Sequence, residues 1–239
     1  MTTETDNVVG AGPEKASRWE DFIDVIFSPG QLFERRKGEP WVKPFLILAA
    51  VGVALYYVML PVTGPMIEAS MVENAPPTAT PAQVQQSASV MKFFFGIMAP
   101  VMYLFMVVGT GVAIKFVSAL FDGKPSWRES FVITTFAHYI TVVQSLVVGV
   151  AIFLKNMMGG EPASSDASFG LLRFVDVGRD PVVRALLGRT DLFAIWIAIL
   201  FAVGLMHVAD MPKGKAAITA GIVWALIALP SLAMAALQR

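Results

Sequence analysis

The chain has 239 residues, of which 56% are hydrophobic and 15% are charged, and its mean hydropathy is +0.65. This balance is typical of integral membrane proteins, because soluble domains carry about 25% charged residues. The formal net charge is zero, which provides no field for a nucleic acid, and the absence of cysteine excludes disulfides, thiol catalysis and cysteine-ligated metal.

The N-terminal segment, residues 1–17, is small and polar, and this composition predicts a disordered tail. The first forty residues lack a continuous apolar core preceded by a basic tip. We therefore expect no cleaved signal peptide in this region.

Residues 18–40 predict a collar of two short amphipathic helices that meet at Ser28-Pro29-Gly30 and lie in the cytoplasmic headgroup layer. The first helix has an apolar stripe, and a basic cluster follows the second. Two uses of the collar remain open, namely contact with anionic lipid and docking of a cytoplasmic protein. The residues expected to make these contacts are Trp19, Phe22, Arg35, Arg36, Lys37 and the interfacial anchor Trp41.

Residues 41–239 predict a transmembrane domain, because five apolar segments are long enough for the ~30 Å hydrocarbon core of a bilayer. These spans cover about 43–62, 93–121, 130–154, 191–209 and 215–236. The expected fold class is therefore all-α, a five-helix transmembrane bundle preceded by interfacial amphipathic helices.

Two segments between the spans differ in kind. Residues 74–89 are rich in Pro, Ala, Thr and Gln and predict a flexible extramembrane linker. Within 168–189, Asp180 and Pro181 form a typical helix start. We expect that helix to lie on the outer surface or over the mouth of the bundle, and a gating lid is the alternative.

Lysine and arginine near the ends of the spans predict the orientation. Six of these residues precede the first span, whereas the loop at 63–92 has one, Lys92. The N-terminus is therefore expected in the cytoplasm and the C-terminus on the opposite side. The five basic residues in 155–190 argue against this orientation, although the first span usually determines it.

This orientation predicts that four polar residues of the spans lie in the cytoplasmic third of the membrane: Lys115, His138, His207 and Asp210. They are the candidate site for a polar ligand, a lipid headgroup or a proton, and ordinary structural roles are the alternative. The two histidines lack the spacing of a metalloprotease, and no serine has a convincing base. We expect no catalytic residue, metal or cofactor.

Small residues within two spans predict close helix packing. Those in the second span are Gly109 and Gly111, and those in the last span recur every four positions as Ala217, Gly221 and Ala225.

Three stretches resemble the Yip1-domain membrane proteins: "IFSPGQLFERRKGEPWVKPFLI", "FDGKPSWRESFVITTFAHYI" and "DLFAIWIAILFAVGLMHVADMPKGKAAITAGIVWAL". The resemblance implies a five-helix membrane domain with a cytosolic N-terminus. Eukaryotic members act in vesicle traffic between endoplasmic reticulum and Golgi and associate with Rab-type GTPases and with one another. Their Asp-Leu-Tyr-Gly-Pro-type motif is missing here. The resemblance therefore fits the prokaryotic branch and a bacterial inner membrane.

Two functions follow as hypotheses. The first is a non-enzymatic membrane-organising, trafficking-like or adaptor protein. Its partners would be the lipid bilayer, a membrane or cytoplasmic protein and a second copy of the chain, without nucleic acid. The second is a small transporter or permease component that uses the polar site near the inner leaflet, although the five spans contain no evident internal repeat.

Overall fold

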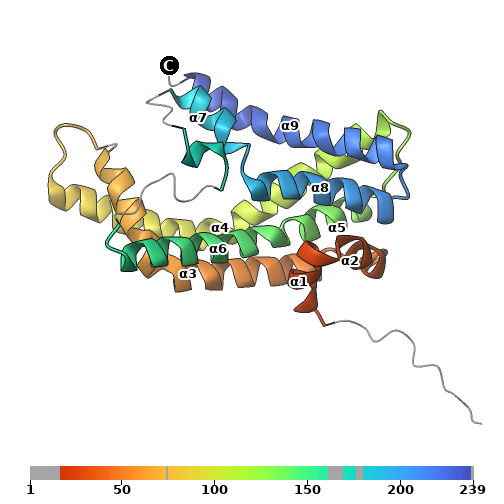
Figure 1. Cartoon of the computed structure of the whole chain (residues 1–239), viewed down its shortest axis with the longest axis horizontal. Helices are drawn as coiled ribbons and strands as arrows, with labels where there is room; N and C mark the ends of the chain where they lie inside the picture. The colour runs from red at the N-terminus through yellow and green to blue at the C-terminus, as the bar shows by residue number, and fades with distance from the viewer. Residues whose placement is uncertain (1–16, 74, 161–168, 176–179, 238–239) are drawn as a thin grey trace, which may run out of the picture.

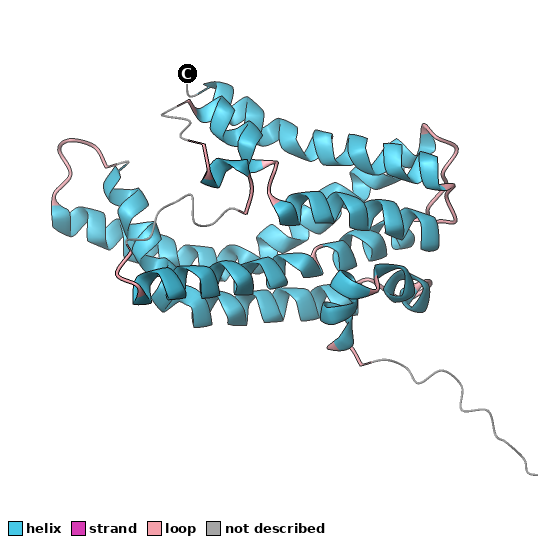
Figure 2. Cartoon of the chain, in the orientation of Figure 1, coloured by secondary structure: helices cyan, strands magenta, loops and turns pink. Residues whose placement is uncertain are grey.

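The computed structural model describes residues 17–73, 75–160, 169–175 and 180–237. Every regular element within these ranges is a helix (Figure 2). The all-α prediction is thus confirmed. The expected tail at 1–17 falls almost entirely outside the described residues.

Two short helices, α1 (Glu20–Phe27) and α2 (Pro29–Arg36), form an N-terminal hairpin in front of the first long helix. The long helices are α3 (Val42–Glu73), α4 (Pro81–Ala119) and α9 (Lys213–Leu237). Helices α5 (Trp127–Ala137) and α6 (Tyr139–Met157) form a third long segment that is interrupted only at His138. A 3-10 turn (Leu171–Arg173) precedes α7 (Pro181–Gly188) and α8 (Leu192–His207).

Four helical segments are long and apolar enough to cross a membrane: α3, α4, α5 with α6, and α9. A fifth crossing results if α7 and α8, which are bent by 52° relative to each other, count as one broken span. Helix α8 alone has 16 residues and a length of about 24 Å, which is short for a bilayer core.

Helix α7 lies against α9, and none of its residues is buried (Figure 1). The expected start is present, since Asp180 accepts hydrogen bonds from the backbone of Val182 and Val183. Just after α7, the guanidinium of Arg189 donates to the carbonyl of Ile227 in α9 at 2.9 Å. This arginine is therefore part of the packing between helices and is not a free loop charge.

The bundle extends beyond the thickness of a bilayer. Helices α3 and α4 have 32 and 39 residues, which correspond to about 48 and 58 Å. The prediction of a flexible linker at 74–89 is wrong for residues 81–89, because these residues form the first turns of α4. The reason is a capping box, in which Thr80 accepts from the backbone of Gln83 and the Gln83 side chain accepts from the backbone of Thr80.

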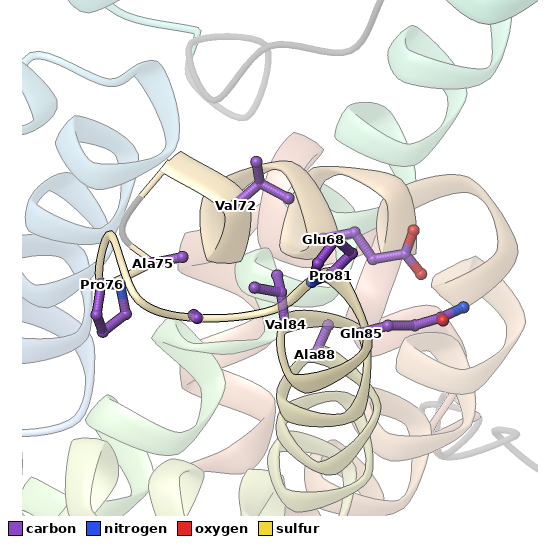
Figure 3. Close-up of a pocket in the computed structure, with 9 residues that line it drawn as sticks. Glu68, Val72, Ala75, Pro76, Pro81, Val84, Gln85 and Ala88 are labelled. Carbon is purple, nitrogen blue, oxygen red and sulfur yellow. The ribbon is translucent and has the colours of Figure 1, made fainter.

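A hollow of about 520 Å³ lies between the end of α3 and the start of α4 (Figure 3). Apolar side chains and the loop between these helices form most of its lining, and Glu68 and Gln85 add polar groups. Glu68 also pairs with Lys92 of α4 at 2.5 Å. This ion pair holds the two helix ends together.

Helix α5 occupies the centre of the bundle, since every residue from Ser130 to Ala137 except Phe131 is buried. It contacts α2, α3, α4 and α8, and two of the largest fully buried side chains, Phe136 and Phe201, belong to the same core. Tyr139, directly after the interruption, donates a hydrogen bond to the Pro44 carbonyl of α3 at 3.0 Å. The start of the first span and the middle of the third are thereby joined.

Candidate functional site

The N-terminal hairpin lies against the end of the bundle at which α3 begins and the α4–α5 and α8–α9 loops lie (Figure 1). Pro29 occupies the first turn of α2, as the sequence predicts. The Ser28 side chain, however, makes no capping hydrogen bond. Docking against the bundle, and not a strong cap, therefore holds the two short helices in place.

The inward face of the hairpin belongs to the hydrophobic core. Val25, Leu32 and Phe33 have no solvent exposure. Phe22 stacks on Tyr139 of α6 with ring centroids 4.3 Å apart, and the indole of Trp196 in α8 donates to the Val25 carbonyl at 3.1 Å. The hairpin is thus an integral part of the fold.

Gly30, at the tip of the hairpin, permits a close approach of α2 to α8. A Cβ at this position would lie 3.1 Å from Nε2 of His207, at the end of α8. Nδ1 of the same imidazole donates to the Glu34 carboxylate at 2.9 Å. His207 therefore fastens the hairpin to α8 through Nδ1, and Gly30 leaves room for the other side of its ring.

A network of ion pairs joins the two helices of the hairpin. Asp21 is fully buried, and its Oδ1 accepts from Nε and Nη2 of Arg36 at 3.1 and 3.0 Å and from Arg35 at 3.1 Å. Arg35 also reaches Asp24 at 2.5 Å, and Arg36 reaches Glu39 at 3.0 Å. The two arginines therefore have four carboxylate contacts within the hairpin and the turn that follows it.

Burial and charge shift two of these carboxyl groups in opposite directions. Burial raises the pKa of Asp21 above its ordinary 3.8, although bonds from Arg36 and Arg35 act against the shift. Partial burial also opposes ionisation of Glu39, but hydrogen bonds from Arg36 and Arg18 prevail and lower its pKa below 4.5. The pKa of Asp21 is therefore higher, and that of Glu39 lower, than the ordinary value of each group.

The residues of the basic cluster, for which contact with lipid and contact with a protein partner were both open, pair with carboxylates of the chain itself. Arg36 is only 4% exposed. Lys37 pairs with Asp210 of the α8–α9 loop at 2.6 Å. The sequence suggested free charges because the carboxylate partners are 15 and 173 residues away from their cations along the chain.

The outward face of α1 presents three large apolar side chains, which we call the apolar ridge. Trp19, Ile23 and Phe27 are 66%, 59% and 77% exposed. The apolar stripe predicted for the first helix therefore has two parts, because Phe22 packs against the core and these three side chains do not. Trp41 also packs against protein, with its ring 5.2 Å from that of Phe131.

The four polar residues of the spans do not form one cluster. His207 and Asp210 hold Glu34 and Lys37 of the hairpin region, as described above. Lys115 donates to the Pro125 carbonyl at 2.5 Å, and His138 is buried at the interruption between α5 and α6. Each member therefore has its own structural partner.

The small residues of α4 and α9 that were expected to pack closely also differ in their surroundings. A Cβ on Gly111 would lie 2.5 Å from the Phe131 ring, so that α4 and α5 pack closely at this point. Gly109 and Gly221 instead have open space at the Cβ position. Ala217 and Ala225 are exposed, and the repeat on α9 faces away from the other helices.

One feature of this end of the bundle was missed in the sequence. Asp122 and Asp210 adopt left-handed backbone conformations, with φ of 61° and 52°, in the two loops. Asp122 pairs with Lys215 at 2.7 Å, as Asp210 does with Lys37. Aspartate is enriched at left-handed backbone positions. The sequence signal for the two turns was an aspartate three residues before Pro125 and another three residues before Lys213. Among the described residues, no three His, Asp or Glu side chains are grouped to hold a metal ion.

Comparison with known proteins gives one match. No curated protein and no solved structure matches the chain significantly. The Yip1 domain family matches residues 23–234, which extend from within α1 to within the last turns of α9. The protein is therefore an integral membrane protein that belongs to the Yip1 domain family.

Proposed function

We propose that the protein is a non-enzymatic membrane adaptor that presents its hairpin to a protein partner at the cytoplasmic face. The observation that carries this proposal is the apolar ridge of Trp19, Ile23 and Phe27 on a hairpin that is otherwise locked to the bundle. Exposed apolar clusters mark interaction surfaces, and tryptophan is enriched among the residues that dominate binding energy. A docked hairpin also loses little conformational freedom on binding.

The charges around the ridge favour a protein partner over an anionic membrane surface. Interfacial helices usually bind such membranes through free lysine and arginine on their polar face. Here Arg35 and Arg36 are paired within the hairpin, and Lys37 is paired with Asp210. Glu20 in α1 and Glu34 in α2 are exposed carboxylates of the hairpin.

The proposed orientation places the hairpin and the α4–α5 and α8–α9 loops in the cytoplasm and the C-terminus across a bacterial inner membrane. Lys43, Lys124 and Lys213 are exposed at that end and support this orientation. Arg189, one of the five basic residues that argue against it, donates to the Ile227 carbonyl of α9. Because the chain has no cysteine, Lys124→Cys and Thr78→Cys variants each carry a single thiol. In intact cells an impermeant maleimide should label Thr78→Cys only, and the reverse pattern would overturn the orientation.

The transporter alternative receives less support. It relied on one polar site built from Lys115, His138, His207 and Asp210, and these residues have separate partners. Two of them fasten the hairpin. The observations therefore favour the adaptor.

A capture experiment with the full chain tests the adaptor proposal. The wild type and a Trp19→Gln/Ile23→Gln/Phe27→Gln variant are purified from membranes in mild detergent, and the proteins that copurify are identified. Leu120→Gln is the matched control, since Leu120 is 76% exposed near the same end but outside the hairpin. We expect the ridge variant to lose partners that the wild type and the control retain. Identical partner lists for all three would contradict the proposal.

A further inference from the structure

We propose that a cavity between α4 and α9 binds a glycerolipid with a free hydroxyl group, such as a diacylglycerol, through His138 and Thr110. The cavity has a volume of about 310 Å³ and is lined by α4 residues between 105 and 113, α9 residues between 226 and 230, and His138. This site is independent of the hairpin and of the adaptor function proposed above.

His138 presents one free hydrogen-bond acceptor to the cavity. The Thr134 carbonyl accepts from the backbone nitrogen of His138 at 3.0 Å and lies 2.7 Å from its ring Nδ1. A carbonyl can only accept, so Nδ1 carries a proton and Nε2 of the neutral ring keeps its lone pair. His138 is only 3% exposed, and its Nε2 has no hydrogen-bond partner among the described residues.

Thr110 supplies the second polar group of the lining. It is 4% exposed, and its hydroxyl has no hydrogen-bond partner within the described part of the chain. Two other hydroxyls in the spans are paired, since Thr134 donates to the Val107 carbonyl and Ser145 to the Thr141 carbonyl. The hydroxyls of Ser118, Thr135 and Thr219 also have no partner among the described residues, but these three residues do not line the cavity. The cavity therefore offers one acceptor and one hydroxyl to a ligand, and unpaired polar groups of this kind are costly to bury.

The remaining lining selects the chemical class of the ligand. Among the described residues it contains no carboxylate, ammonium or guanidinium group, so an ion or a phosphate headgroup would lose its hydration without compensation. Phe105 is 71% and Leu226 41% exposed, so that the cavity opens sideways on the apolar surface of α4 and α9. His138 follows the 11 residues of α5, which places it about 17 Å along that segment. The ligand therefore enters from the bilayer and is uncharged.

A diacylglycerol fits both the polar groups and the space. Its hydroxyl donates to Nε2 of His138, and an ester carbonyl accepts from the Thr110 hydroxyl. At roughly 30 Å³ for each heavy atom, the cavity holds about ten atoms, which is enough for the glycerol and the first ester groups. The acyl chains then extend through the side opening along α4 and α9.

Two probes that differ only at the hydroxyl test the chemistry. The full chain in lipid nanodiscs is incubated with 1,2-dioleoylglycerol or with its 3-O-acetyl ester, and the amount retained is measured by mass spectrometry. We expect one molecule of the alcohol to bind for each protein molecule, and the ester to bind about five- to tenfold more weakly. Equal retention of the two probes, or no retention of either, would overturn the proposal.

Matched variants locate the site. Gly109→Leu fills the cavity, whereas Gly221→Leu makes the same change on α9 outside it, and both positions have open space for a Cβ. We expect the first to abolish retention of the alcohol and the second to preserve it. His138→Phe should remove the preference for the alcohol over the ester. If that variant does not fold, the isosteric Thr110→Val variant provides a second test, and it should retain less of the alcohol than the wild type. Wild-type retention by folded Gly109→Leu would refute the assigned site.

Discussion

Replacement of Arg36 by methionine removes the centre of the ion network in the hairpin. The guanidinium makes two hydrogen bonds to Asp21 and one to Glu39, and methionine retains only the apolar part of the side chain. Asp21 would then remain fully buried, with Oδ2 already unpaired among the described residues and with Arg35 as its remaining cation. We therefore expect Arg36→Met to weaken the docking of the hairpin while the long helices stay folded.

The magnitude follows from the burial of the carboxylate. Removal of one partner from a buried ion pair costs about 3–5 kcal/mol, because a charge remains uncompensated. Arg35 still contacts Asp21 in the variant, so the lower end of this range applies, and we expect about 3 kcal/mol. This free energy corresponds to about a 100-fold increase in the population of the open hairpin.

Hydrogen exchange of the backbone amides measures this opening directly. In nanodiscs, exchange across residues 20–36 should accelerate about 100-fold in Arg36→Met, while α4 and α9 keep their protection. Arg35→Met is the control, since its side chain is 27% exposed and the Asp21–Arg36 pair remains. Similar acceleration in the two variants, or none in Arg36→Met, would refute the assignment of the buried pair as the main lock.

Acidification should partly restore the variant. Burial raises the pKa of Asp21, and loss of Arg36 removes an interaction that lowers it. Because the folded variant then binds a proton more readily than the open one, its stability rises as the pH falls through this raised pKa. Exchange across the hairpin of Arg36→Met should therefore slow between neutral and mildly acidic pH, after correction for the intrinsic rate.

Three further predictions concern other contacts. Gly111→Leu should lower the free energy of unfolding by about 1–3 kcal/mol, because the new side chain meets the Phe131 ring, and Gly221→Leu should not lower it in the same detergent-based unfolding assay. Because the pKa of Glu39 is lowered, Glu39 should stabilise the hairpin above pH 4.5, and this stabilisation should be lost as the pH falls through the lowered pKa. In Glu39→Gln, hydrogen exchange across the hairpin should no longer show this pH dependence. Thr80→Ala should destabilise the start of α4 by about 1 kcal/mol, visible as faster local exchange, and unchanged protection there would argue against the capping box.

Hydropathy was sufficient to predict a helical membrane bundle, because each span must satisfy its own backbone hydrogen bonds. It did not show where helices end outside the membrane. The stretch after Thr80 looks like a linker in composition, yet a Thr-x-x-Gln pattern starts a helix there. Local capping chemistry was readable in the sequence and outweighed the composition.

The candidate polar site shows a different limit. Depth along each span placed Lys115 and His138 near each other and near His207, but depth gives no rotation about a helix axis. In the structure Lys115 points toward Pro125, His207 points toward the hairpin, and His138 lines the cavity between α4 and α9. Side-chain direction depends on packing between helices, which a single sequence does not specify.

The charges of the hairpin show why sequence distance matters. Arg35, Arg36 and Lys37 are adjacent in the chain, and adjacency suggested one positive surface. Residues that follow one another along the chain point in different directions. Arg35 and Arg36 share Asp21, but Arg35 also reaches Asp24 and Arg36 also reaches Glu39. Lys37 instead meets Asp210. Once these pairs form, the hairpin has little free positive charge, and its exposed character is set by the apolar ridge. A basic cluster before a membrane span therefore indicates lipid contact only if the carboxylates that the fold brings to it are too few to neutralise it.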